Sequence, residues 1–61
     1  MEKVTYKITR TDCITYENTF TNVKVRKDEN GVSIYSKEYH GLLLAFYPIN
    51  WALELVEIEH L

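Results

Sequence analysis

Apolar and polar residues alternate with a period of two along much of this chain, and this pattern limits what the chain can fold into. The clearest stretch is residues 4–9, in which Val4, Tyr6 and Ile8 alternate with polar residues. Successive side chains of a strand point to opposite faces, so the stretch predicts a strand with one buried face. The same alternation predicts three further strands, over residues 14–16, 23–27 and 32–36.

Turn signals separate these predicted strands. The Thr and Asp side chains of residues 10–13 favour local bonds to the backbone, so a turn is expected there. Asn30-Gly31 is the strongest turn signal, because a tight hairpin needs positive φ angles that Asn and Gly adopt readily. Residues 17–22 are ambiguous, and Phe20 is expected to anchor them to the core.

The second half of the chain is more apolar. Residues 42–47 show no alternation, which is typical of a strand covered on both faces or of a short buried helix. The length of the run and the following Pro48 favour the strand. We expect one helical turn over residues 48–52, because Pro fits the first position of a helix, and a last strand over residues 53–59.

A C-terminal helix over residues 49–61 is the alternative to that last strand. Ile49, Ala52, Leu53 and Val56 are helically spaced, and Leu, Glu and Ala form helices readily. Of the two, we favour the strand.

Five or six short strands without a strong helix predict an all-β fold, either a small antiparallel barrel or a strongly bent sheet. The order of strand, turn, strand, Asn-Gly hairpin, apolar strand, Pro-containing turn and final strand resembles SH3-like and Sm-like small barrels. Residues 46–51 followed by 56–59 are also similar to the ends of small barrel proteins of bacteriophages and mobile elements. The resemblance implies one helical turn before the last strand. No family function carries over, since the Sm RNA-binding signature and the acidic loop of peptide-binding SH3 domains are missing.

The length of 61 residues predicts a single domain over residues 1–61 that needs extra stabilisation. One cysteine, Cys13, excludes an internal disulfide, and with only His40 and His60 beside it we expect no metal and no cofactor. A homodimer or larger oligomer is therefore expected. The lone cysteine and the lack of a secretory signal predict a cytoplasmic protein, and residues 42–53 are too short an apolar run to span a membrane.

Charge is divided along the chain. Residues 1–37 contain all seven Lys and Arg residues and five of the nine acids, whereas residues 38–61 contain four acids and no Lys or Arg. The two parts can attract each other within one fold or between copies. The net charge of −2 makes nucleic acid a less favoured partner.

The last two strands carry more apolar residues than one interior can hold, which predicts a contact with another copy. If residues 53–59 form a regular strand, Leu53 and Leu55 lie on the opposite face from Val56 and Ile58. Glu54 then lies on the opposite face from Glu57 and Glu59. A bulge would change this. The predicted oligomer interface consists of apolar residues of these strands: Leu43, Leu53, Leu55, Val56 and Ile58.

A binding surface is expected to combine aromatic and basic residues. Aromatic residues are enriched at interface hot spots, and Lys and Arg contact phosphates. If the first and third strands share a sheet, their four basic residues lie on one outer face. The candidates are Lys3, Lys7, Lys24, Arg26, Tyr35, Tyr47 and Trp51. Core packing is the alternative role for Trp51, and a solvated sheet face is the alternative for the basic residues.

Catalysis is not expected. The chain has no Gly-rich phosphate loop, and a Cys13–His40 pair is outweighed by the reading of Cys13 as a free thiol in a turn. The favoured hypothesis is a non-enzymatic binding protein, acting as an oligomer, that modulates a host protein and is encoded by a phage. The alternatives are an oligomeric sponge that binds a small nucleotide or anion between subunits and an Sm-like nucleic-acid binder.

Overall fold

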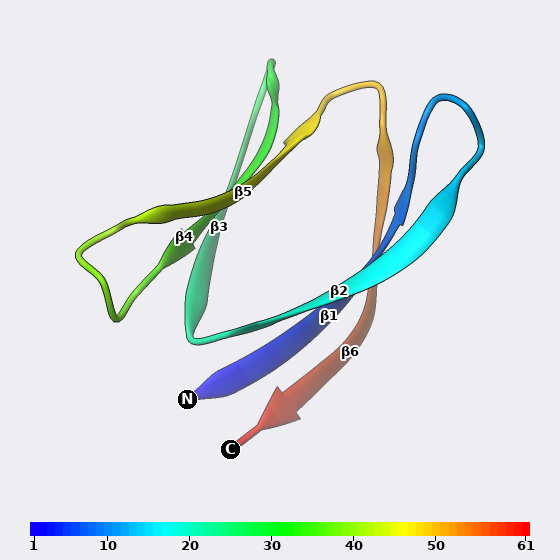
Figure 1. Cartoon of the computed structure of the whole chain (residues 1–61). Helices are drawn as coiled ribbons and strands as arrows, with labels where there is room; N and C mark the ends of the chain where they lie inside the picture. Colours follow the sequence, from blue (N-terminus) through cyan, green and yellow to red (C-terminus); the bar gives the residue numbers. More distant parts are fainter.

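A computed structural model describes all of residues 1–61 and contains six strands (Figure 1). The strands are β1 (Glu2–Thr9), β2 (Thr15–Thr21), β3 (Val23–Asp28), β4 (Gly31–Ser36), β5 (Leu43–Pro48) and β6 (Ala52–His60). The prediction of an all-β fold is confirmed. The C-terminal segment is a strand, so the alternative helix over residues 49–61 is wrong.

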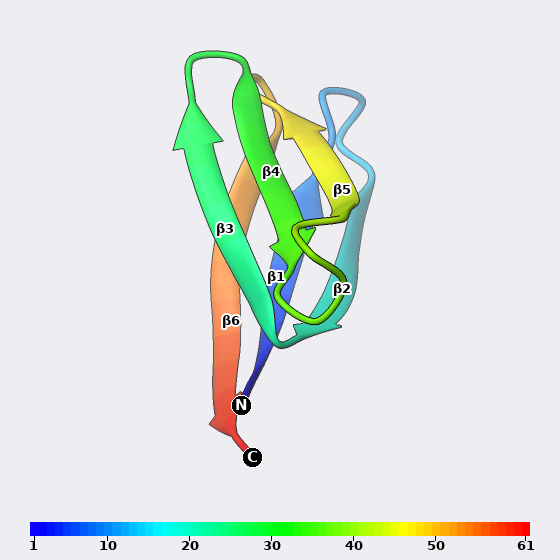
Figure 2. The ribbon, with the colours of Figure 1, turned by 90° about the vertical axis from the view of Figure 1, so that its left-hand side faces the viewer.

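The strands form two antiparallel sheets of three, which face each other as two layers (Figure 2). Sheet A has the order β2-β1-β6, and sheet B has the order β3-β4-β5. The expected barrel does not close, because β6 pairs only with β1 and β3 pairs only with β4. Each sheet therefore has two unpaired edges.

A single residue, Asn22, carries the chain from sheet A to sheet B. Its φ of 54° lies in the left-handed region, which Asn tolerates better than most residues. The Asn22 N–H donates to the Glu2 carbonyl at 2.8 Å, and the Asn22 carbonyl accepts from the Lys37 N–H at 3.0 Å. β2 and β3 thus act as one bent strand that contributes an edge to each sheet.

The hairpin between β3 and β4 turns one residue earlier than the Asn-Gly signal predicts. Asp28 pairs with Gly31, so Glu29 and Asn30 form the loop and Gly31 begins β4. A carboxylate oxygen of Asp28 accepts from the N–H groups of Asn30 at 2.8 Å and Gly31 at 3.2 Å. The Asp28 side chain, rather than an Asn-Gly turn, organises this loop.

The segment between β5 and β6 is a turn, so the predicted helical turn is wrong. Pro48 ends β5, and the Trp51 N–H donates to the Pro48 carbonyl at 3.0 Å. This bond does not continue into a helix, because Ala52 already pairs with Thr9 in sheet A.

The core is small and lies between the two sheets. Ile8 of sheet A and Ile34 of sheet B are fully buried and pack with Tyr47. Burial of each such side chain contributes on the order of 1.5–3 kcal/mol to the free energy of folding. The Tyr47 hydroxyl accepts a hydrogen bond from the Asn18 amide at 3.0 Å, which ties β5 to β2. Residues partly buried around this core are Tyr6, Tyr16, Phe20, Val23, Ala45, Trp51 and Leu53.

A register shift in β6 changes which of its side chains face inward. Tyr6 pairs with Leu55 while Thr5 pairs with Glu57, so Val56 is an extra residue in a β-bulge. Ile58 therefore shares the inner face with Leu55. The bulge likewise places Glu54, Glu57 and Glu59 together on the outer face, which corrects the expectation for a regular strand.

Candidate binding surfaces

The outer face of sheet A is polar across all three strands. The Thr5 and Thr19 hydroxyls lie 3.0 Å apart, and those of Thr9 and Thr15 lie 3.2 Å apart. In the strand register, Lys7 lies opposite Glu17 of β2 and opposite Glu54 of β6. The Lys3 ammonium lies 3.9 Å from a Glu59 oxygen. The side chains of this face are well hydrated, and a contact would have to remove that water. The face is therefore a poor candidate for a binding surface.

The outer face of sheet B differs sharply. Val32 and Ile34 of β4 face the core, so the alternating residues Ser33 and Tyr35 face outward. Strand pairing extends these two positions into rows across the sheet. The rows run Lys24, Tyr35, Leu43 and Arg26, Ser33, Phe46. This face therefore grades from basic on β3 to apolar on β5.

The apolar side of this face is uncovered. Phe46 is 46% exposed, and Leu43 is exposed to a similar degree. The Phe46 ring lies over Gly31, because a Cβ at Gly31 would lie 3.0 Å from the Phe46 Cζ. Gly31 and Ser33 are both buried, whereas the ring itself remains exposed. An exposed ring beside small neighbours is typical of a contact surface.

A second surface is the cleft between β3 and β6, which we call the β3–β6 cleft. It has a volume of about 270 Å³ and is lined by Tyr6, Val25, Lys27, Val32, Leu53 and Leu55. Partial burial raises the pKa of the Tyr6 hydroxyl above that of an exposed tyrosine. Lys27 is the one charged side chain in this lining.

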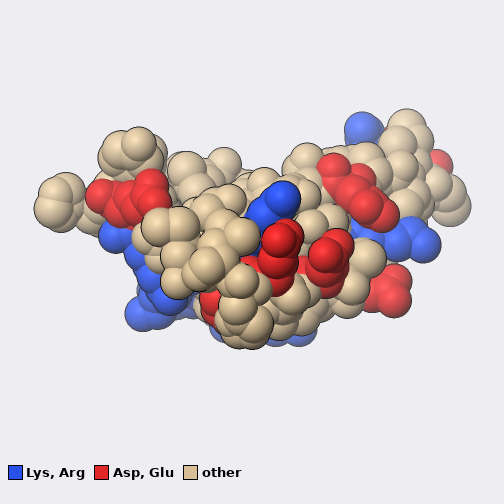
Figure 3. All heavy atoms as spheres, turned by 90° about the horizontal axis from the view of Figure 1, so that it is seen from below, with Lys and Arg blue, Asp and Glu red and all other residues tan.

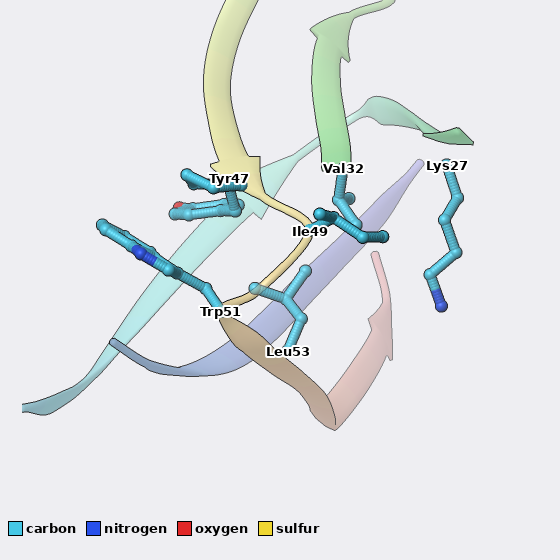
Figure 4. A pocket seen from close by; sticks show the side chains of 7 residues that line it. Lys27, Val32, Tyr47, Ile49, Trp51 and Leu53 are labelled. Carbon is cyan, nitrogen blue, oxygen red and sulfur yellow. The ribbon is translucent and has the colours of Figure 1, made fainter. Parts of the chain in front are cut away.

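The cleft continues towards the β5–β6 turn as a smaller pocket of about 170 Å³, which shares Lys27, Val32 and Leu53 with it. Figure 4 shows Trp51 and Tyr47 side by side at one end of this pocket and Lys27 at the other. The two aromatic ring centroids are 6.3 Å apart, and the Arg10 guanidinium lies 5.6 Å from the Trp51 ring. Trp51 therefore packs between the core and a cation.

The predicted basic patch does not form. Lys3 and Lys7 lie on the outer face of sheet A, whereas Lys24 and Arg26 lie on the outer face of sheet B. The condition for the patch fails because β1 and β3 belong to different sheets. In the view from below, basic and acidic side chains are interspersed across the molecule (Figure 3).

The three aromatic candidates lie in different environments. Tyr35 faces outward on sheet B. Tyr47 is only 4% exposed, so as a core residue it is not a contact residue. Trp51 is half-buried, in agreement with its alternative role in packing.

The predicted oligomer interface is divided between two surfaces. Leu43 lies on the outer face of sheet B, away from the other four residues. Leu53 is half-buried in the inner face, whereas Leu55, Val56 and Ile58 are exposed along β6.

Sequence reasoning missed Phe46 and Val25 as surface residues. Phe46 lies in a run without alternation, so the pattern did not assign it a face. Val25 was correctly expected to face inward, but the alternation carried no information on the open side that leaves it exposed. Only the pairing of β3 with β4 and of β6 with β1 could reveal that opening.

The structure brings together no group of three His, Cys, Asp or Glu side chains that could hold a metal ion. No helix is present with the length and apolar character needed to cross a membrane. Cys13 is exposed, in the turn between β1 and β2. Comparison with protein-family models, with curated proteins and with solved structures finds no match to this chain.

Proposed function

We propose that this protein is a non-enzymatic binding protein, acting as an oligomer, that holds a protein partner on the outer face of sheet B. One observation carries the proposal, namely the apolar area formed by the exposed Leu43 and Phe46 beside the half-buried Tyr35, on a face with no covering element. The opposite face of the sandwich is polar except for Ala52, so the molecule has one side suited to contact and one suited to water.

The partner surface is apolar with acidic residues at its border. Leu43 and Phe46 offer the apolar contact, and Lys24 and Arg26 lie two strands away at the basic edge of the same face. Interfaces commonly have an apolar centre within a polar rim. The proposal keeps a phage-encoded modulator of a host protein, and its support is the resemblance of residues 46–51 and 56–59 to small barrel proteins of bacteriophages.

The test compares three tagged forms: the wild-type chain, the double variant Leu43→Ser/Phe46→Ser and the control Ile14→Ser. Ile14 is 52% exposed but lies in the turn after β1, away from sheet B. The wild-type and control chains are expected to capture the same protein from cells that express this chain naturally. The double variant is expected to bind that protein at least about tenfold more weakly, as for loss of a hot spot.

Denaturation curves first establish that all three forms are folded. Equal capture by the double variant would contradict the proposal, as would the lack of any protein that depends on this face. A photo-crosslinking residue at position 35 should label the captured protein, whereas one at position 19 on the outer face of sheet A should not.

A small nucleotide is the second candidate ligand. Lys24 lies beside Tyr35 in one row, and Arg26 shares the next row with Phe46, so a phosphate and a base could be held together. A panel of cyclic and linear nucleotides should then raise the melting temperature of the wild-type chain but not that of Lys24→Glu/Arg26→Glu. A panel that shifts neither form removes this candidate.

A further inference from the structure

The open side of the sandwich has two unpaired strand edges, β3 of sheet B and β6 of sheet A. Figure 2 shows the two strands on the same side of the molecule, running in opposite directions. Their outer N–H and C=O groups are available to a further strand. The apolar β3–β6 cleft lies between them.

Two inward-facing side chains remain exposed at this open side. Val25 pairs with the buried Ile34, and Ile58 pairs with Val4, so both lie on inner faces of the sandwich. Even so, Val25 is 40% exposed and Ile58 is 47% exposed. Their burial against an apolar surface would be favourable, so the inner layer is incomplete at this edge.

The two edges carry opposite charges on their outward sides. The outward residues Lys24 and Arg26 of β3 are basic, and those of β6 are Glu54, Glu57 and Glu59. The bulge at Val56 is what places these three glutamates on one face. An occupant of the open side must therefore offer an acidic edge to β3 and a basic edge to β6.

Neither β3 nor β6 pairs favourably with the same strand of a second copy. Every outward residue of β6 except Ala52 is a glutamate, so two β6 strands paired face to face place Glu opposite Glu. Two β3 strands centred on Val25 place Lys24 opposite Arg26 twice. Like charges directly opposite each other destabilise a strand pair.

We propose that the occupant is a second copy of this chain, joined by reciprocal pairing of β3 with the partner's β6 and of β6 with the partner's β3. This proposal rests on the part of the proposed function in which the chain acts as an oligomer. A two-fold axis parallel to the strands, placed along the open side, exchanges the two layers. It sets each β3 antiparallel to a β6, because the two strands run in opposite directions within one chain.

Face and charge together select one register. Lys24 lies opposite the partner's Glu59, Val25 opposite the partner's Ile58, and Arg26 opposite the partner's Glu57. A slip by one residue in either direction would place Val25 opposite a glutamate, and a slip by two leaves at most one ion pair with matching faces.

This register completes rows of side chains through six strands. The outer row is Thr21, Lys3, Glu59, then Lys24, Tyr35 and Leu43 of the partner subunit. The inner row is Phe20, Val4, Ile58, then Val25, Ile34 and Ala45 of the partner subunit. The outer row alternates in charge at the junction, and the inner row is apolar from end to end. The exposed Val25 and Ile58 become the centre of a continuous core.

Lys27 limits the pairing. It follows Arg26, faces inward opposite Val32 and lines the cleft. An inward-pointing charge on an edge strand hinders extended pairing with other chains. The contact therefore ends at Arg26, and the reciprocal arrangement uses both edges at once, which closes the dimer instead of growing a filament.

The test uses two variants with reversed charges. Lys24→Glu/Arg26→Glu makes both edges acidic, and Glu57→Lys/Glu59→Lys makes both edges basic. Each variant alone is expected to be monomeric, with dimer affinity lowered at least about tenfold by four unfavourable pairs. An equal mixture is expected to form dimers of one chain of each kind, since both contacts are then complementary. Native mass spectrometry distinguishes this species.

Controls separate this result from misfolding. Arg26→Glu should weaken the wild-type dimer, whereas Lys37→Glu makes the same charge change in the loop after β4 and should not. Unfolding curves confirm that each variant is folded. A monomeric wild-type chain, dimers of either double variant alone or a mixture that stays monomeric would each overturn the proposal.

A disulfide tests the register directly. In a Cys13→Ser background, Val25→Cys mixed with Ile58→Cys should form an intermolecular disulfide on mild oxidation, because the two positions are directly opposite. Thr19→Cys in place of Ile58→Cys should not. Cross-linking no faster than with Thr19→Cys would overturn this register. Capture of a partner protein by a wild-type chain that is monomeric would leave the binding part of the proposed function standing while the dimer fails.

Discussion

At Gly31 the chain passes so close to the end of β5 that a side chain has no room. An added Cβ would overlap the Tyr47 carbonyl oxygen and would also approach the Ile49 nitrogen to 3.1 Å. The φ of 148° is a second constraint, since residues with a Cβ rarely adopt it. Gly31 therefore allows the start of β4 to approach the end of β5 this closely.

Gly31→Ala is expected to lower the free energy of unfolding by about 2–4 kcal/mol, from backbone strain and overlap together. Gly41→Ala is the matched control. Its φ of 80° is also unfavourable for Ala, but no atom lies within 4 Å of the added Cβ, so a loss of about 1 kcal/mol is expected. Urea unfolding measures both losses. Equal losses would show that the contact with Tyr47 has no effect.

Residue faces could be predicted from the sequence wherever alternation was regular. Val4, Ile8 and Val25 face inward as their pattern indicates. The pattern failed at Ile58, because a bulge at Val56 reverses the alternation and no residue type marks a bulge. It failed also at Tyr47, whose place in an unbroken apolar run gave no face.

At the scale of elements, all the predicted strands are present. Short strands of β-branched and aromatic residues between turns are a strong local signal, so most of their positions could be predicted from the sequence. The exception is β2, because residues 17–22 were ambiguous and residues 17–21 continue that strand. Barrel closure could not, because it depends on pairing between strands distant in the chain. The helical turn was predicted from Pro48 and from the resemblance to SH3-like barrels, but pairing of Ala52 with Thr9 begins β6 before a helix can form.

Deletion of Val56 tests the bulge in β6. The change should leave the fold intact, with the free energy of unfolding altered by less than about 1 kcal/mol, because Leu55, Glu57 and Ile58 keep their partners in a regular strand. Deletion of Ile58 is the control and should cost at least about 2 kcal/mol, since it places a glutamate opposite Val4. Urea unfolding measures both; a large loss on deletion of Val56 would show that the bulge itself is needed.

At the scale of the whole molecule, the sandwich has little interior for its surface. Only Ile8, Val32, Ile34 and Tyr47 are buried apolar residues. The expectation of self-association came from this imbalance and from the division of charge along the chain. The sequence could not assign the charges to particular edges, because that assignment depends on which strands end each sheet.

If a dimer closes the open side, stability should rise with protein concentration. Each tenfold increase in concentration adds about 1.4 kcal/mol per mole of dimer by mass action. The melting temperature of the wild-type chain should therefore increase with concentration, whereas that of Lys24→Glu/Arg26→Glu should stay constant. Differential scanning calorimetry at several concentrations measures this. Constant melting temperatures for both would contradict a dimer that unfolds as it dissociates.

The pairing of β1 with β6 has a consequence for the order of folding. Sheet B is assembled from neighbouring hairpins within residues 23–48, so its contacts need only short loops to close. Sheet A needs β6 to return to β1 across the whole of sheet B, which costs more chain entropy before any contact is gained. We expect sheet B to form first, and the β1–β6 pairing to set the folding rate. Until that pairing forms, the basic edge of β3 is exposed while β6, with its acidic edge, is not yet a strand.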